Sequence, residues 1–344
     1  MAISFFSVLD SLITYSHPPT RTLMVLRHDN TTCIDAAWYP HLIEKILTSA
    51  SLRALISYRC TSRENESEVY RILKKQGCHM VLAKKRFNTY ELGFRDGSTV
   101  LYPQTPSLVE DLVATTRLLD LDGDAIQTNL GSLASTLTDL KVVRVVDYQH
   151  PPMGGPQLLP FHTPTYIVSL NTYGNELHFS DRRKTPFRNG LTKLVVVIHT
   201  GGSYSDVRLS NNQSSVFYSP PNSSLEHVVF IFTEIPGASR KEEVDSHFLG
   251  RMQLFALLVT TARHYCQRPS LKKFILVGLP CLVDCLVNLS LIQSDDHTLD
   301  TRVTAFVEDL ASLCKEHPDV VQVLTPEEYR AEVGEGQYAL ETMA

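Results

Sequence analysis

The sequence predicts an α/β protein in which a short helical module precedes a larger body of buried strands and connecting helices. Three observations support this fold class. Apolar residues recur at helical spacing between residues 38 and 77. Beyond residue 78, short and almost uniformly apolar runs alternate with turns, which is typical of parallel strands covered on both faces. The centres of three such runs, Leu118, Val143 and Ile167, lie about 25 residues apart, which indicates a repeating unit.

Composition limits the classes of protein to consider. The chain has 344 residues, 43% hydrophobic and 20% charged, which suffices for a buried core and suggests more than one domain. Its net charge is −5 and its basic residues are scattered, so we expect no nucleic-acid partner. No apolar run is long enough to span a membrane, and we expect no membrane partner. The seven cysteines include no CxxC pair, which indicates a reducing intracellular compartment, cytoplasm or nucleus, and no metal or other cofactor.

Residues 1–37 are treated as a separate N-terminal segment. Its apolar stretch lacks a basic start and carries Asp10, which argues against an export signal. A short amphipathic helix is the alternative, and it would place four apolar residues on one side: Ile3, Phe6, Leu9 and Ile13.

Three short helices are predicted within residues 38–77. Pro40 suits the first turn of the first helix, where its missing N–H is harmless. The second is expected within residues 51–62 and the third within 62–77, where Gly77 can end it. Helices this short bury little surface by themselves, so they must pack on the rest of the chain or on a partner.

The residue order in this module resembles an F-box. Tyr39-Pro40 stands where that family has a Leu-Pro pair, and Arg59-Cys60 stands near its closing Cys-Arg segment. The family's acidic residue after the proline is His41 here, and the third helix has no tryptophan. The resemblance implies docking on a Skp-type adaptor of a cullin–RING ubiquitin ligase. It implies these adaptor-binding residues: Pro40, Leu42, Ile43, Ile46, Leu47, Leu52 and Leu55. A helical cap packed on the adjoining domain would bury the same residues, and this alternative stays open.

The body, residues 78–344, begins with three short strands at 79–85, 89–94 and 98–102. Asp96-Gly97 is a hairpin signal between the last two strands. The series of apolar strands follows, and its later members are centred on Val196 and Phe230. A helix expected over residues 124–140 would connect the first two strands of the series as a parallel crossover.

The C-terminal third continues the alternation of helices and strands. Helices are expected at 247–266 and 301–317, and strands at 272–279 and 320–324. The second of these helices should bury one face: Val303, Phe306, Val307, Leu310, Leu313 and Cys314. A last helix then starts with Thr325 as N-cap and Glu328 at the capping-box position.

A strand every 20–29 residues is typical of a leucine-rich-repeat-like solenoid, and a parallel α/β sheet is the alternative. The whole pattern resembles uncharacterised basidiomycete-yeast proteins that join an F-box-like start to an irregular leucine-rich-repeat-like body. LKVVRVV, LTKLVVVI and the ending LTPEEYRAEVGEGQYALET carry this resemblance. It implies a non-catalytic adaptor that recognises an unknown substrate protein.

Two further functions were weighed. The loop after the strand at Val196 contains His199, Gly201-Gly202, Ser203 and Asp206, a combination that could hold an anion or supply an acid–base group. An α/β enzyme of unrecognised class would use these residues, whereas an ordinary loop needs the glycines only for their backbone freedom. The sequence contains no GxSxG, GxGxxG or phosphate-loop motif. The third possibility is an interaction protein without a ligase role.

Overall fold

The fold is that of a computed structural model, and it divides into two compact units, Met1–Gln76 and Gly77–Ala344. Each unit is described by itself. The structure describes residues 40–50, 52–59, 61–84, 90–94, 99–100, 113–122, 131–146, 161–171, 190–199, 224–233, 258–279 and 297–342.

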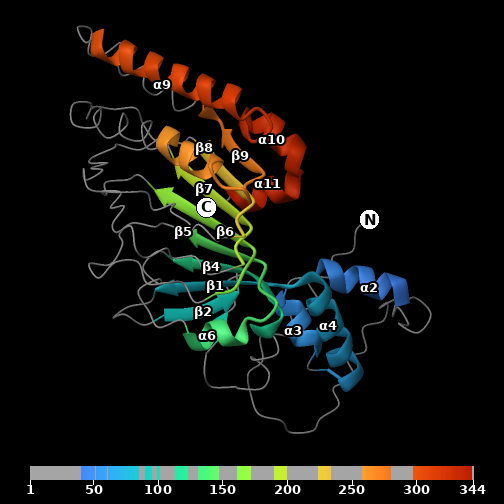
Figure 1. Ribbon diagram of the computed structural model, residues 1–344. Helices are drawn as coiled ribbons and strands as arrows, with labels where there is room; N and C mark the ends of the chain where they lie inside the picture. Colours follow the sequence, from blue (N-terminus) through green and yellow to red (C-terminus); the bar gives the residue numbers. More distant parts are fainter. Residues whose placement is uncertain are drawn as a thin grey trace. The chain divides into compact units, whose positions relative to one another are not determined.

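The described part of the first unit consists of three helices: α2 (Pro40–Ser49), α3 (Leu52–Arg59) and α4 (Arg63–Gln76) (Figure 1). All three were predicted. Ser62 caps α4, because its hydroxyl accepts a hydrogen bond from the Asn65 N–H at 3.1 Å. Gly77 follows α4 with φ of 79°, the left-handed conformation in which a glycine commonly ends a helix.

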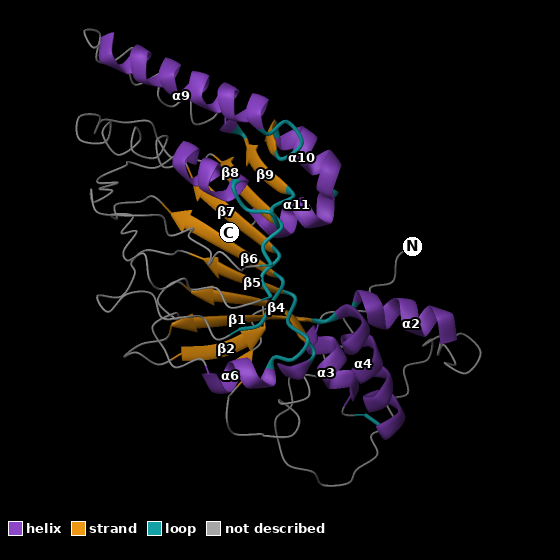
Figure 2. Ribbon diagram, viewed as in Figure 1, coloured by secondary structure: helices purple, strands orange, loops and turns teal. Residues whose placement is uncertain are grey.

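The described part of the second unit is built on one ten-stranded sheet (Figure 2). Its strands are β1 (Cys78–Lys84), β2 (Tyr90–Phe94), β3 (Thr99–Val100), β4 (Thr116–Asp122), β5 (Val142–Val146), β6 (Thr165–Asn171), β7 (Lys193–His199), β8 (His227–Thr233), β9 (Lys273–Val277) and β10 (Val321–Leu324). β2 pairs antiparallel with β1 and with β3, as expected for the predicted hairpin, although Asp96-Gly97 lies outside the described residues. The pairs from β1 through β4 to β10 are all parallel, which confirms the predicted α/β fold.

Chain order and sheet order coincide from β4 to β10. A doubly wound sheet reverses its strand order once, and its ligand crevice lies where that reversal separates two neighbouring crossovers. No reversal occurs along these seven strands, and the order turns back only between β1 and β4, because β2 and β3 lie on the other side of β1. The strands β4 to β10 therefore follow one another in one direction, as in a structure that adds one strand per repeat.

Helices pack on both faces of the sheet. The helical residues 258–266 place Tyr265 beside Phe274, with ring centroids 6.3 Å apart, and Phe274 beside Phe230 at 5.6 Å. We call this side of the sheet the crossover face. α10 (Pro326–Val333) and α11 (Glu335–Thr342) cover the opposite side, which we call the hairpin face. Its buried cluster comprises Ile167, Val195, Val197, Val229, Ile231, Ile275, Val277 and Tyr329.

Burial on both faces explains why these strands are apolar at every position. In β7, β8 and β9, alternate residues face opposite layers, and both layers exclude water. Burying one side chain the size of valine or phenylalanine contributes about 1.5–3 kcal/mol to stability. The strand interior is therefore a main source of stability in the second unit.

Two local expectations need correction, and one helix was not predicted. The helix expected over 124–140 ends early in the described part, because α6 (Gly131–Thr136) stops before Leu137. Thr136 and the following Thr–Asp pair favour turns over helix, and the Thr136 hydroxyl bonds back to the Leu133 carbonyl at 2.8 Å. In α9 (His297–Glu316), Val307 is 49% exposed rather than buried, because the buried stripe is narrow and follows Phe306, Leu310 and Leu313. No separate helix was predicted from the sequence at α11.

Candidate functional site

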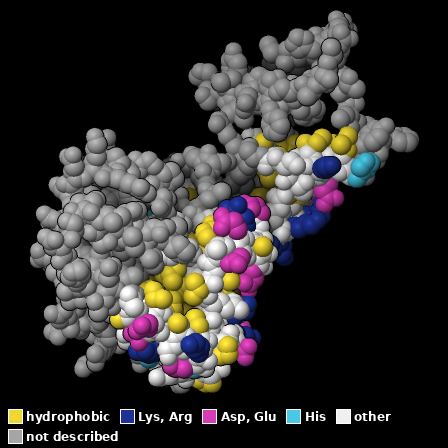
Figure 3. All heavy atoms as spheres, turned by 90° about the horizontal axis from the view of Figure 1, so that it is seen from above, with side chains coloured by type: hydrophobic (Ala, Val, Ile, Leu, Met, Phe, Trp, Pro, Cys, Tyr) yellow, Lys and Arg dark blue, Asp and Glu magenta, His cyan; other side chains and the backbone are white. Residues whose placement is uncertain are grey.

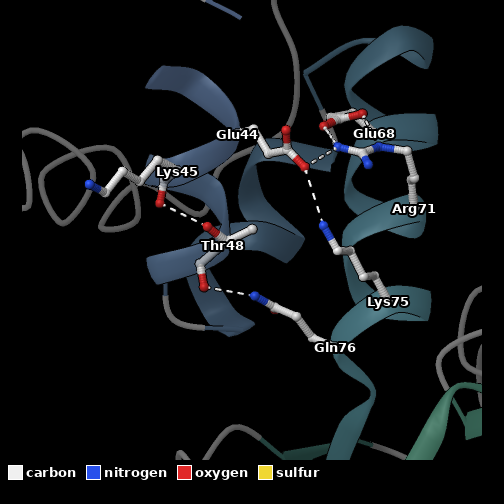
Figure 4. A network of polar contacts seen from close by, with 7 residues as sticks. All are labelled: Glu44, Lys45, Thr48, Glu68, Arg71, Lys75 and Gln76. Carbon is white, nitrogen blue, oxygen red and sulfur yellow. Dashed lines mark hydrogen bonds and ion pairs between the residues drawn. The ribbon is translucent and has the colours of Figure 1, made fainter. Parts of the chain in front are cut away.

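In the first unit, α2 is fixed to α4 by a polar network (Figure 4). Glu44 accepts a hydrogen bond from Arg71 at 3.0 Å and lies 3.8 Å from the Lys75 ammonium. Arg71 also binds Glu68 on its own helix at 2.7 Å, and Gln76 donates to the Thr48 carbonyl at 2.8 Å. The hydrogen bond and the positive charge of Arg71 are the main reasons why the pKa of Glu44 lies below its ordinary value. Glu44 and Thr48, one turn apart, thus mark the side of α2 that faces α4.

The residues that the F-box resemblance assigns to adaptor binding fall into two groups. Leu47 and Leu55 are buried, at 6% and 2% exposure, together with Val69, Ile72 and Leu73 of α4. Leu42, Ile43 and Ile46 of α2 are only partly buried. Pro40 and Leu52 are the first residues of α2 and α3, and their side chains lie outside the description.

Helical geometry separates the partly buried group from the polar network. Successive residues are rotated by about 100° around a helix, so Leu42 and Ile46 lie roughly opposite Glu44 and Thr48. α2 therefore has one side fixed to α4 and an apolar side turned away from that contact. This second side is the candidate docking surface of the first unit.

In the second unit, His199 lies at the carboxyl end of β7, where the sequence suggested a catalytic or anion-binding loop. Its Nε2 is 2.9 Å from the Ser169 hydroxyl on β6, and its Nδ1 is 2.9 Å from the Thr233 hydroxyl on β8. The imidazole thus connects three adjacent strands. Gly201-Gly202, Ser203 and Asp206, which the sequence analysis grouped with His199, lie outside the described residues.

The hairpin face contains a buried group of charged side chains that the sequence analysis did not predict. Arg144 on β5 is 2% exposed and binds Asp120 on β4 through two hydrogen bonds of 2.8 and 2.7 Å. His79 on β1 adds a contact of 2.8 Å from its Nε2 to Asp120. Burial raises the pKa of Asp120, but the hydrogen bonds from His79 and Arg144 outweigh it and hold that pKa below its ordinary value. The available signal was a charged residue between two apolar neighbours in each of two strands: Asp120 between Leu119 and Leu121, and Arg144 between Val143 and Val145.

The C-terminal helices are fixed to the sheet by polar contacts as well as by the apolar cluster. Arg144 donates to the Leu340 carbonyl of α11 at 3.2 Å. Glu341, 1% exposed, accepts hydrogen bonds from Lys193 at 2.5 Å, from Tyr329 at 2.6 Å and from Gln337 at 2.5 Å. Burial and the Glu341 carboxylate raise the pKa of the Tyr329 hydroxyl far above its ordinary value. These contacts satisfy a buried carboxylate internally and indicate a structural role.

Basic side chains cluster at the amino ends of three neighbouring strands. Lys193, His227 and Lys273 occupy the same register position on β7, β8 and β9. Lys273 pairs with Glu332 of α10 at 2.5 Å, as Lys193 pairs with Glu341. Burial lowers the pKa of His227, and the neighbouring lysines reinforce this effect against the opposite effect of Glu226. His227 is therefore favoured in its neutral form between two paired lysines.

The described cysteines are poor nucleophiles. Burial, with smaller effects of Cys314 and Glu316, raises the pKa of Cys266 to about 11. Burial also raises the pKa of Cys78 and of Cys314. The thiolate is the reactive form, so a raised pKa lowers reactivity at neutral pH. Within the residues that the structure describes, no three His, Cys, Asp or Glu side chains are grouped to hold a metal ion.

Acidic and basic side chains are interspersed over the described part of the face shown in Figure 3, with apolar side chains between them. None of the described helices is both long and apolar enough to cross a membrane.

Comparisons with protein-family models, with curated proteins and with solved structures each found no match.

Proposed function

We propose that the protein is a non-catalytic adaptor that binds a Skp-type protein of a cullin–RING ubiquitin ligase through α2 and presents a substrate protein on its α/β body. The observation that carries the proposal is that α2 contacts α4 with a polar side and keeps an apolar side partly exposed. Glu44 binds α4, while Leu42, Ile43 and Ile46 remain partly exposed on other sides of the helix. Partly exposed apolar side chains on one stripe are the usual anchors of a helix-mediated interface.

The structure narrows the residues that the proposal assigns to the adaptor. Leu47 and Leu55 are nearly inaccessible, so they support the module from within. Leu42, Ile43 and Ile46 carry the docking, together with Pro40 and Leu52 at the helix starts. The proposed adaptor surface is thus a short stripe on α2 together with the first residue of α3.

The second unit suits the recognition role because its strands β4 to β10 follow one another in one direction. Repeated strands of this kind give extended surfaces to which a protein partner can bind. The hairpin face of the sheet is covered over β6 to β9 by the protein's own α10 and α11. Substrate recognition is therefore assigned to the other surfaces of this unit.

Co-purification with a Skp-type adaptor tests the proposal. Leu42→Asp/Ile46→Asp should abolish capture of the full-length chain, because it places two carboxylates in the apolar stripe. His41→Asp/Lys45→Asp is the matched control, since both residues are exposed on α2 and the change adds at least as much negative charge. Thermal unfolding verifies that both variants fold.

The control variant should bind as the wild type does. The adaptor proposal fails if no capture occurs with the wild type, or if the stripe variant is captured as well as the control. Stable association of the wild type with another protein but with no Skp-type adaptor would favour an interaction protein without a ligase role.

A further inference from the structure

One edge of the sheet leaves backbone groups open. β10 is the terminal strand of the sheet and pairs with β9 alone among the described strands. The Phe274 N–H donates to the Val320 carbonyl at 2.8 Å, and the Gly278 N–H donates to the Leu324 carbonyl at 3.0 Å. Backbone groups alternate in direction along a strand, so those of Val321 and Val323 point away from β9.

Within the described part of the chain, most of these outward groups have no backbone partner. The Val321 N–H is used locally, because it donates to the His317 carbonyl at 2.9 Å. The Val321 carbonyl and both backbone groups of Val323 face the open edge. Natural edge strands are commonly protected by a charge or a proline, but the β10 sequence VQVL contains neither.

An apolar side chain accompanies the outward backbone groups. Val323 is 41% exposed on the edge strand. Val323 shares its register position with Leu276 of β9, so it lies on the crossover face, away from α10 and α11. Strand addition uses this combination: the backbone groups provide affinity, and alternate side chains provide selectivity.

Exposed acidic side chains precede and follow β10 in the sequence. The exposed acidic residues just before and after β10 are Glu316, Asp319, Glu327 and Glu328. Two exposed basic residues, Lys315 and Arg330, lie in the same stretch. Arg330 is engaged within the C-terminal helices, where it lies 4.6 Å from the centroid of the Tyr338 ring and 3.5 Å from the Glu335 carboxylate. Glu328 is engaged as well, because it accepts a hydrogen bond from the Thr325 N–H at 2.8 Å, and Glu316, Asp319 and Glu327 then stand against Lys315. The surroundings of the edge therefore favour a basic partner.

We propose that the edge formed by Val321–Leu324 binds an extended peptide segment by strand addition. The segment carries apolar side chains at alternate positions and lysine or arginine at its ends. Only the assignment of this segment to a substrate protein rests on the proposed adaptor function.

Fluorescence anisotropy on the full-length chain tests this inference with two labelled peptides. Both have a Val-Thr-Val-Thr-Val core, and one is flanked by lysines while the other is flanked by glutamates. The lysine-flanked peptide should bind at least about tenfold more tightly, because carboxylates bracket the strand. Asp319→Lys/Glu327→Lys should reverse that preference.

Val323→Pro tests the backbone contribution. It removes the outward N–H without removing a bond to β9, and edge strands tolerate proline at such positions. It should weaken binding of the lysine-flanked peptide by about tenfold or more. Val323→Thr is the matched control, since it keeps the N–H and a β-branched side chain, and it should bind like the wild type.

The inference is overturned if neither peptide binds, if the flanking charges make no difference, or if Val323→Pro binds as tightly as Val323→Thr. A chain that dimerises in sedimentation and becomes monomeric with Val323→Pro would identify a second copy as the occupant and would also overturn it. Leu42→Asp/Ile46→Asp should leave peptide binding unchanged. Loss of adaptor capture and loss of peptide binding are therefore separable results.

Discussion

Removing the charge of Asp120 should destabilise the second unit strongly, because Arg144 would remain buried without its carboxylate. Arg144 is 2% exposed, and the two hydrogen bonds of 2.8 and 2.7 Å connect it to Asp120. Breaking one partner of a buried ion pair costs about 3–5 kcal/mol, since the remaining charge keeps its desolvation penalty. Asp120→Leu should therefore lower the free energy of unfolding by about this amount.

The double variant Asp120→Leu/Arg144→Met separates charge from packing. It leaves no buried charge at this position, so it should recover most of the stability lost in Asp120→Leu. The matched control is Asp309→Asn, which breaks a pair with Arg263 in which both side chains are about half exposed. That change should cost only about 0–1 kcal/mol.

Urea unfolding followed by far-UV circular dichroism measures all of these free energies on the full-length chain. The reasoning would be refuted by a loss below about 1 kcal/mol for Asp120→Leu, since that value is typical of an exposed pair. A double variant less stable than Asp120→Leu would refute the explanation by an uncompensated charge, because it would show that Arg144 stabilises the fold without its partner.

Three further predictions concern the same unit. Burial lowers the pKa of His227 in the folded chain, so the unfolded chain binds the proton more readily. The free energy of unfolding should therefore fall as the pH drops below about 6.5, the ordinary pKa of histidine. His227→Gln should weaken this pH dependence, measured by urea unfolding at several pH values. Tyr329→Phe should cost about 1–3 kcal/mol in thermal or urea unfolding, because it removes a donor to the buried Glu341, and an unchanged stability would contradict that role. Gly278→Ala should lower stability by about 1–3 kcal/mol, since φ is 72° and the added Cβ would lie 2.6 Å from the Phe232 carbonyl oxygen; the same change at exposed Gly336, which has open space, is the control.

Much of the sheet could be predicted from the sequence because its signals are local. The apolar runs around Val196 and Phe230 correspond to β7 and β8, and their almost uniformly apolar composition correctly indicated parallel strands buried on both faces. The capping box of Thr325 and Glu328 is also present, with hydrogen bonds of 3.1 and 2.8 Å. Such features depend on residues a few positions apart, so spacing alone reveals them.

Features that depend on distant residues could not be predicted. The pairing of Asp120 with Arg144 requires the register between β4 and β5, which neither strand encodes by itself. Val307 was expected to be buried because it continues an apolar stripe, but the width of the stripe that packs depends on the neighbouring layer. The contacts of His199 with Ser169 and Thr233 also depend on the register of three adjacent strands, which its own loop does not encode.

Hydrogen exchange of the full-length chain, with and without a Skp-type adaptor, tests the proposed function most directly. The account predicts that the adaptor slows exchange over residues 40–50, because the stripe of Leu42 and Ile46 on α2 becomes covered. It also predicts unchanged exchange in β7 and β8, which are buried within the second unit. No change over residues 40–50, or a change confined to the second unit, would contradict the assignment of α2 as the docking helix.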